Sequence, residues 1–215
     1  MALPKIIERY QMKYLLILLF LCLPFSQLMA QDANAGKALY ATCAACHGAN
    51  GEGVKATNAP AIAGQEPWYL LRQLKNFKEG IRGTHAQDTY GTQMRPMAMM
   101  LADETAMKNV IAYIQTFKPA KGEAHKGDLN AGKTAYVTCT ACHGANAEGN
   151  QALNAPKLTT LPGDYLVRQL KNFKAGIRGS HPQDTYGAQM KPMSMMLAND
   201  QAIDNVVAYI RSLAK

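Results

Sequence analysis

The sequence predicts an all-α protein built from two similar domains, and three observations lead to this prediction. Residues 32–114 match residues 128–210 without a gap when the chain is shifted by 96 positions. Apolar residues in both halves recur at helical spacing, with no sustained two-residue alternation. Each half also contains one Cys-x-x-Cys-His run, at residues 43–47 and 139–143.

The first 30 residues differ from the rest and are typical of a secretory signal. Lys5, Arg9 and Lys13 precede an apolar run that is closed by Pro24, and the segment ends in Ala30. The run is shorter than the roughly 20 residues that span a bilayer, so we expect cleavage near Ala30 and export to the periplasm. The alternative is an uncleaved membrane anchor, and association with the membrane surface is compatible with either.

Each repeat is expected to hold three main helices. The first begins near Asp32, whose side chain suits an N-cap, and runs into the cysteine motif. The second has Pro67 at its start and Gly80 near its end, with an apolar face at Leu70, Leu74, Phe77 and Ile81. The third begins around Asp103, and its predicted core stripe is Met107, Val110, Ile111 and Ile114, repeated as Ile203, Val206, Val207 and Ile210.

These elements divide the chain into four parts. Residues 1–30 are the expected signal, 31–117 the first domain, 118–127 a linker rich in Pro, Gly and charge, and 128–215 the second domain. Three main helices in about 90 residues leave a small core, so a large apolar ligand is expected to complete it.

The Cys-x-x-Cys-His run predicts covalent attachment of haem c. The thiols of Cys43 and Cys46, and those of Cys139 and Cys142, would form thioethers with the haem vinyl groups. A four-cysteine zinc site needs its two pairs roughly 15 to 20 residues apart, which they are not. A thioredoxin-like redox pair would need a βαβ context and gives no reason for the adjacent histidine. Two haem c groups per chain are therefore expected.

The iron of each haem would take His47 or His143 on one side, and the sequence offers two kinds of residue for the other. Met94 and Met190 fall in segments predicted to be loops, from which a side chain can approach the haem face. The remaining methionines of each cluster are expected to pack in the core. His85 and His181 recur at the same register and are the rival ligands, or else polar loop residues.

Charge gives little information about partners. The formal net charge of +8 falls to +6 without the signal, and to about +2 if two haems bring four ionised propionates. No basic run with interleaved aromatic residues is present, which argues against nucleic acid as a partner.

The residues resemble the di-haem cytochrome c4 family, which has two class I cytochrome c domains in tandem. The resemblance rests on the two cysteine motifs, on the Tyr-Leu-x-x-Gln-Leu-x-x-Phe-Lys-x-Gly segments that begin at Tyr69 and Tyr165, and on the Met-x-x-Met leads that begin at Met94 and Met190. It implies that Met94 and Met190 are the second iron ligands, and that the Pro60 and Pro156 carbonyls orient the iron-bound histidines. The Gly64-Gln65 pair of the first repeat has no counterpart in the second.

Six ligands on each iron leave no open position, so the sequence indicates an electron carrier rather than an enzyme. The resemblance implies transfer from a quinol-oxidising complex, or a dehydrogenase, toward a terminal oxidase. The alternatives are the cytochrome subunit of a periplasmic dehydrogenase and a di-haem peroxidase. A peroxidase needs one haem that differs from the other, which the similarity of the repeats disfavours.

Overall fold

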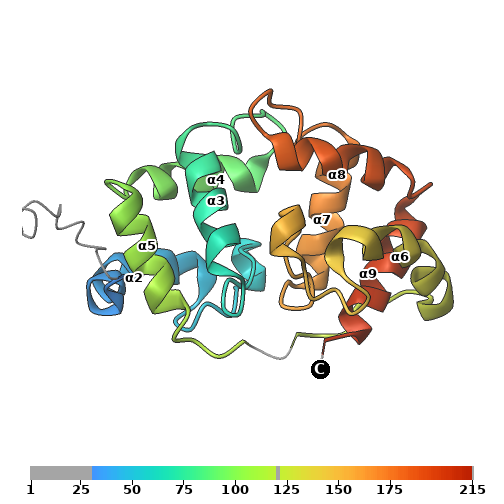
Figure 1. Cartoon of the computed structure of the whole chain (residues 1–215), viewed down its shortest axis with the longest axis horizontal. Helices are drawn as coiled ribbons and strands as arrows, with labels where there is room; N and C mark the ends of the chain where they lie inside the picture. Colours follow the sequence, from blue (N-terminus) through green and yellow to red (C-terminus); the bar gives the residue numbers. More distant parts are fainter. Residues whose placement is uncertain (1–30, 120–121, 215) are drawn as a thin grey trace, which may run out of the picture. The chain divides into compact units, whose positions relative to one another are not determined.

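The computed structural model describes residues 31–119 and 122–214, and this part of the chain is helical with no strand (Figure 1). The signal predicted for residues 1–30 lies outside it. The first domain contains α2 (Ala33–His47), α3 (Pro67–Lys78), α4 (Thr89–Met99) and α5 (Glu104–Ile114), with a 3₁₀ turn at Lys55–Thr57. The second contains α6 (Leu129–His143), α7 (Gly163–Lys174), α8 (Thr185–Met195) and α9 (Asp200–Ser212), with a 3₁₀ turn at Gln151–Leu153. The prediction of a duplicated all-α fold is confirmed.

The outer pair of helices in each domain crosses at a glycine. α2 packs on α5, and α6 packs on α9 (Figure 1). A Cβ atom at Gly36 would collide with the Asn109 carbonyl, and one at Gly132 with the Asn205 carbonyl. The Asp32 carboxylate accepts from the amides of Asn34 and Ala35, which is the N-cap that the sequence predicts. These contacts fix the helix that carries each cysteine motif.

The core of each domain follows the predicted stripes. Met107, Val110, Ile111 and Ile114 of α5 are buried, as are Ile203, Val206, Val207 and Ile210 of α9. Tyr40 and Tyr136 pack beside them, and their hydroxyls donate to the carbonyls of Gly48 (2.6 Å) and Gly144 (2.9 Å). Burial raises the pKa of Tyr40 to about 12, so the hydroxyl stays a donor.

The segment that holds the methionine cluster was predicted as a loop, and this prediction is wrong. Met94 and Met190 lie inside α4 and α8, which are additional helices between the second and third predicted ones. The sequence suggests a loop because Gly91 and Pro96 both disfavour helix. Tertiary contacts override them: Asp88 caps the helix by accepting from Gly91 N, and Gly91 and Ala98 are buried. The second helix is also shorter than predicted, so Ile81 follows α3 instead of lying on it.

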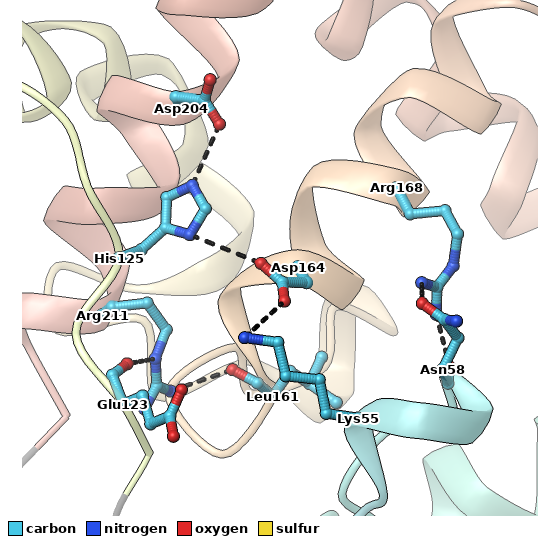
Figure 2. Close-up of polar contacts among 9 residues, drawn as sticks. All are labelled: Lys55, Asn58, Glu123, His125, Leu161, Asp164, Arg168, Asp204 and Arg211. Carbon is cyan, nitrogen blue, oxygen red and sulfur yellow. Dashed lines mark hydrogen bonds and ion pairs between the residues drawn. The ribbon is translucent and has the colours of Figure 1, made fainter.

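The segment between the domains is fastened to the second domain (Figure 2). Arg211, which is buried, donates from Nε to the Glu123 carbonyl (3.2 Å) and from a terminal nitrogen to the Leu161 carbonyl (2.9 Å). His125 Nε2 lies 3.0 Å from an Asp204 carboxylate oxygen, and its Nδ1 lies 4.0 Å from Asp164. These contacts of His125 anchor the segment to the second domain.

Within residues 31–119 and 122–214, no helix combines the length and the continuous apolar character that a bilayer span requires.

Candidate functional site

The cysteine motif of each domain forms part of the wall of a largely apolar cavity. Cys43, Cys46 and His47 line the first cavity together with Pro60 and Met94. The second cavity has the matching set of Cys139, Cys142, His143, Pro156 and Met190. All eight predicted site residues are therefore brought together, four in each domain. No disulfide joins the four described cysteines.

The imidazoles are oriented by a backbone carbonyl, as the resemblance implied. His47 Nδ1 lies 2.8 Å from the Pro60 carbonyl oxygen, and His143 Nδ1 lies 2.8 Å from that of Pro156. A carbonyl can only accept, so Nδ1 carries the proton and Nε2 keeps its lone pair. Burial lowers the pKa of both histidines, which keeps the rings neutral. A neutral imidazole with a fixed tautomer is suited to bind iron.

The pKa shifts of the cysteines do not fit a redox pair. Burial raises the pKa of Cys43 and of Cys139. Redox-active Cys-x-x-Cys pairs work through a thiol whose pKa is lowered. The shift has the opposite sign here, so the structure argues against a thioredoxin-like function.

Methionine and histidine differ in their relation to the cavities. Met94 and Met97 line the first cavity, and Met190, Met193 and Met196 line the second. The rival ligands His85 and His181 are not among the lining residues. Nδ1 of each instead accepts from the backbone amide two residues later, at Gln87 and Gln183. The bis-His alternative gains no support from this arrangement.

Haem fits these cavities by the chemistry of their walls. Each offers two free thiols, an imidazole with an available Nε2 and a thioether, surrounded by apolar residues such as Leu70 and Phe77 in the first domain. In the described part of the chain, no group of three His, Cys, Asp or Glu residues could hold a bare metal ion. This set of donors suits haem, because the porphyrin ring supplies the remaining ligands of the iron.

The sequence reasoning missed a polar cluster where the two domains meet. Arg82 donates to Gln73 Oε1 (2.6 Å) and, across the interface, to Gln169 Oε1 (2.9 Å) and the Tyr165 hydroxyl (3.2 Å). Arg178 makes the equivalent bonds to Gln169 (2.8 Å), Gln73 (3.1 Å) and the Tyr69 hydroxyl (3.3 Å). One sequence signal pointed to this cluster: its arginines and glutamines occur at the same positions in both repeats, and they are not part of the apolar face of the helix.

The cluster is positively charged. Burial raises the pKa of Tyr165, but Arg82, Arg178 and Arg168 outweigh burial and leave that pKa below its ordinary value. Tyr69, Gln73, Tyr165 and Gln169 line both cavities, so this cluster is the wall that the two cavities share.

Comparisons with known proteins agree with the motifs and the fold. The family described as Cytochrome c matches residues 33–118 and 129–214. Cytochrome c4 of Azotobacter vinelandii is 32% identical over 195 residues, which cover 86% of this chain and 90% of that protein. A thiosulfate dehydrogenase electron acceptor of Stutzerimonas stutzeri (strain A1501) is 30% identical over 186 residues, or 80% of this chain and 79% of its own length. The solved structure of reduced cytochrome c4 from Pseudomonas stutzeri superimposes with a TM-score of 0.66 at 28% identity, covering 85% of this chain and 98% of that one.

Proposed function

Because the chain belongs to the cytochrome c family, and within it to the di-haem cytochrome c4 proteins, we propose that it carries electrons in a periplasmic respiratory chain. Two covalently bound haem c groups are its cofactors. The donor in this proposal is a quinol-oxidising complex or a dehydrogenase, and the acceptor is a terminal oxidase. The observation that carries the proposal is the pair of matched cavities, each with two thiols, one oriented imidazole and a methionine in its wall.

The proposed ligand set of each iron is drawn from the lining residues. In the first domain, Cys43 and Cys46 would hold the haem, and His47 and Met94 would bind its iron. In the second, Cys139 and Cys142 would hold the haem, and His143 and Met190 would bind its iron. Haem iron with these ligands supplies one-electron chemistry, and a methionine ligand raises its reduction potential relative to a second histidine.

The protein supplies orientation and exclusion of water. The Pro60 carbonyl holds the His47 ring, which fixes the direction in which Nε2 presents its lone pair. The buried apolar residues around the cavity, including Leu101 and Val110, keep solvent from the centre. With a histidine and a methionine of the chain bound to each iron, no ligand position would remain for a substrate, and the haem would supply electron transfer alone.

Export completes the proposal. Residues 1–30 act as a cleaved signal, and the mature protein works in the periplasm, free or associated with the membrane surface. Its domains span residues 31–117 and 128–215, with residues 118–127 as the linker. The order of the two repeats supports these boundaries.

One spectroscopic experiment tests the ligands and the absence of an open position together. The oxidised protein should be low-spin, should not bind cyanide or peroxide readily, and should show the weak far-red sulfur-to-iron charge-transfer band. Met94→Ala and Met190→Ala should each remove about half of that band, in proportion to two equivalent sites. Met97→Leu is the matched control, since Met97 lines the same cavity and lies on the same helix.

Two results would overturn this assignment. Rapid high-spin conversion or peroxide turnover by the unmodified protein would favour the peroxidase alternative. Loss of the band in Met97→Leu, with Met94→Ala unaffected, would move the ligand by one helical turn.

A second role, as the electron acceptor of a periplasmic dehydrogenase, is favoured by the similarity to the thiosulfate dehydrogenase electron acceptor. Both roles use the same sites and differ only in the donor. Mixing the oxidised protein with a quinol-oxidising complex plus quinol, or with thiosulfate dehydrogenase plus thiosulfate, separates them. Faster reduction by the first mixture supports the respiratory role, and faster reduction by the second supports the dehydrogenase role.

A further inference from the structure

Four arginines stand at the ends of the cavities where the domains meet. Arg82 and Arg168 line the first cavity, and Arg72 and Arg178 line the second. In each pair, one arginine belongs to the same domain as the cavity and the other to the opposite domain. The only other fully charged residues in the two walls are Asp88 and Asp184, one in each.

The hydrogen-bond partners of these arginines are neutral. Arg82 and Arg178 donate to glutamine and tyrosine oxygens, as described above, and Arg72 and Arg168 donate to asparagines. Among the residues that the structure describes, no carboxylate lies within ion-pair distance of any of the four. Nε of Arg82, Arg168 and Arg178 is buried without a partner. Asp88 and Asp184 are already used, because each caps a helix.

The arginine that crosses the interface is held firmly in each case. Arg168, on α7 of the second domain, donates to the Asn58 carbonyl (2.7 Å) and side-chain oxygen (3.3 Å) of the first domain (Figure 2). Its guanidinium also lies 4.6 Å from the centre of the Tyr90 ring. Arg72 repeats this in the other direction, with Asn154 (2.9 and 3.0 Å) and with Tyr186 at 4.7 Å. The two crossing arginines are thus preorganised.

Positive charge that is partly removed from water is destabilising unless an anion lies close by. Haem carries two carboxylates, its propionates, and the wall of each cavity contains two guanidinium groups whose positive charge suits them. The number of guanidinium groups therefore equals the number of carboxylates that two haems bring.

We propose that each haem's propionates are bound by one arginine of its own domain and one of the other: Arg82 with Arg168 in the first cavity, Arg178 with Arg72 in the second. The proposal rests on the proposed function, since it takes haem as the occupant. Its consequence is that the reduction potential of each haem is set partly by the opposite domain. A nearby positive charge favours the reduced iron, which carries one positive charge fewer.

Redox titration of the whole holoprotein, followed by its absorption spectrum, tests the crossing. Arg168→Gln should shift one of the two one-electron waves to lower potential, and Arg72→Gln should shift the other. We expect a three- to tenfold change in the ratio of oxidised to reduced iron at fixed potential, where tenfold corresponds to about 59 mV for one electron. Combining Arg168→Gln with Met94→His, which lowers the potential of the first haem, assigns the wave.

The controls separate charge from structure. Arg168→Lys keeps the charge but loses the planar fork that bonds to Asn58, so it should shift the potential in the same direction but less than Arg168→Gln does. Lys133→Gln removes an exposed charge of the second domain that lines neither cavity, and it should shift neither wave. Far-UV circular dichroism of Arg168→Gln should match the unmodified protein.

The proposal is overturned if Arg168→Gln and Arg72→Gln shift the same wave, shift both waves equally, or shift neither. It is also overturned if Arg168→Gln, combined with Met94→His, shifts the wave of the second haem more than that of the first. Failure of the ligand assignment looks different. In that case Met94→His leaves both waves in place, while the single arginine variants still report whether each acts on a different haem.

Discussion

The loops that precede α3 and α7 occupy equivalent places in the two domains, yet they have different partners. In the first domain, the buried Gln65 side chain reaches across the interface and donates to the Lys157 carbonyl (2.9 Å) and the Thr160 hydroxyl (3.1 Å). Its neighbour Glu66 accepts from the Lys157 amide (3.0 Å). In the second domain, Leu161 takes the place of Gln65 and is buried in its own domain's core.

The helices behind the two loops differ in the same way. Gln115 of the first domain donates to the Gln65 carbonyl (2.9 Å), and Arg211, at the equivalent position, donates to the Leu161 and Glu123 carbonyls. Gly64 has φ +76° and leaves room for Pro119 of the interdomain segment, where a Cβ atom would clash. The repeats therefore diverged at these loops and beside the linker, whereas the arginine, glutamine and tyrosine residues elsewhere in the interface are the same in both copies.

The largest effect should come from removing one haem at a time. Cys43→Ala with Cys46→Ala, and Cys139→Ala with Cys142→Ala, should each leave about half of the haem stain on a denaturing gel. The second pair should retain more helical circular dichroism, because Leu161 and Arg211 hold the second domain together without help from haem. Equal helix loss in the two variants would show that the loops contribute little to either domain.

Exchanging the loop residues tests the comparison directly. Leu161→Gln loses apolar burial and places an amide in an apolar core, so it should destabilise the second domain by about 2 to 4 kcal/mol. Gln65→Leu should cost only about 1 kcal/mol, because it removes two hydrogen bonds together with a buried oxygen that has no partner. Denaturant unfolding of the holoprotein measures both. If Gln65→Leu lowers the free energy of unfolding more than Leu161→Gln does, the interface contributes more to stability than the core at this position.

The helix residues behind the loops should give the next largest difference. Arg211→Met leaves the Leu161 and Glu123 carbonyls without a charged donor and should cost about 2 to 3 kcal/mol. Gln115→Met removes one neutral hydrogen bond and should cost about 1 kcal/mol. Limited proteolysis near residues 120–121 should speed up in Arg211→Met only. Faster cleavage in both variants would mean that the first domain also holds the linker.

The smallest difference should appear in acid. Hydrogen bonds from Lys108 (2.7 Å) and from Lys75 hold the pKa of Glu104 at about 2, below its ordinary value of 4.5. A lowered pKa in the folded state stabilises the protein above pH 4.5, and this contribution is lost as the pH falls toward 2. Glu104→Gln should flatten the loss of stability in that range at low salt. In 0.5 M salt the difference between Glu104→Gln and the unmodified protein should disappear.

Several features could be predicted from the sequence because local interactions decide them. The cysteine motif needs only five adjacent residues, and the Asp32 and Asp103 caps bond to amides two or three residues away. The helical stripe of α5 reads directly as its buried face. Each of these features occurs twice, 96 positions apart. The duplicated fold and the two haems could therefore be predicted from the sequence alone.

The tertiary structure decided what depends on residues far apart in the chain. α4 forms although Gly91 and Pro96 disfavour it, because its capped end packs against the turn after α3, where Gly83 meets the Gly91 carbonyl. Arg168 reaches the first cavity through Asn58, which lies 110 positions away in the sequence. No local sequence pattern predicts such a pairing. The pairing is selected because buried polar groups must form hydrogen bonds, and these two residues come together only when both domains are folded.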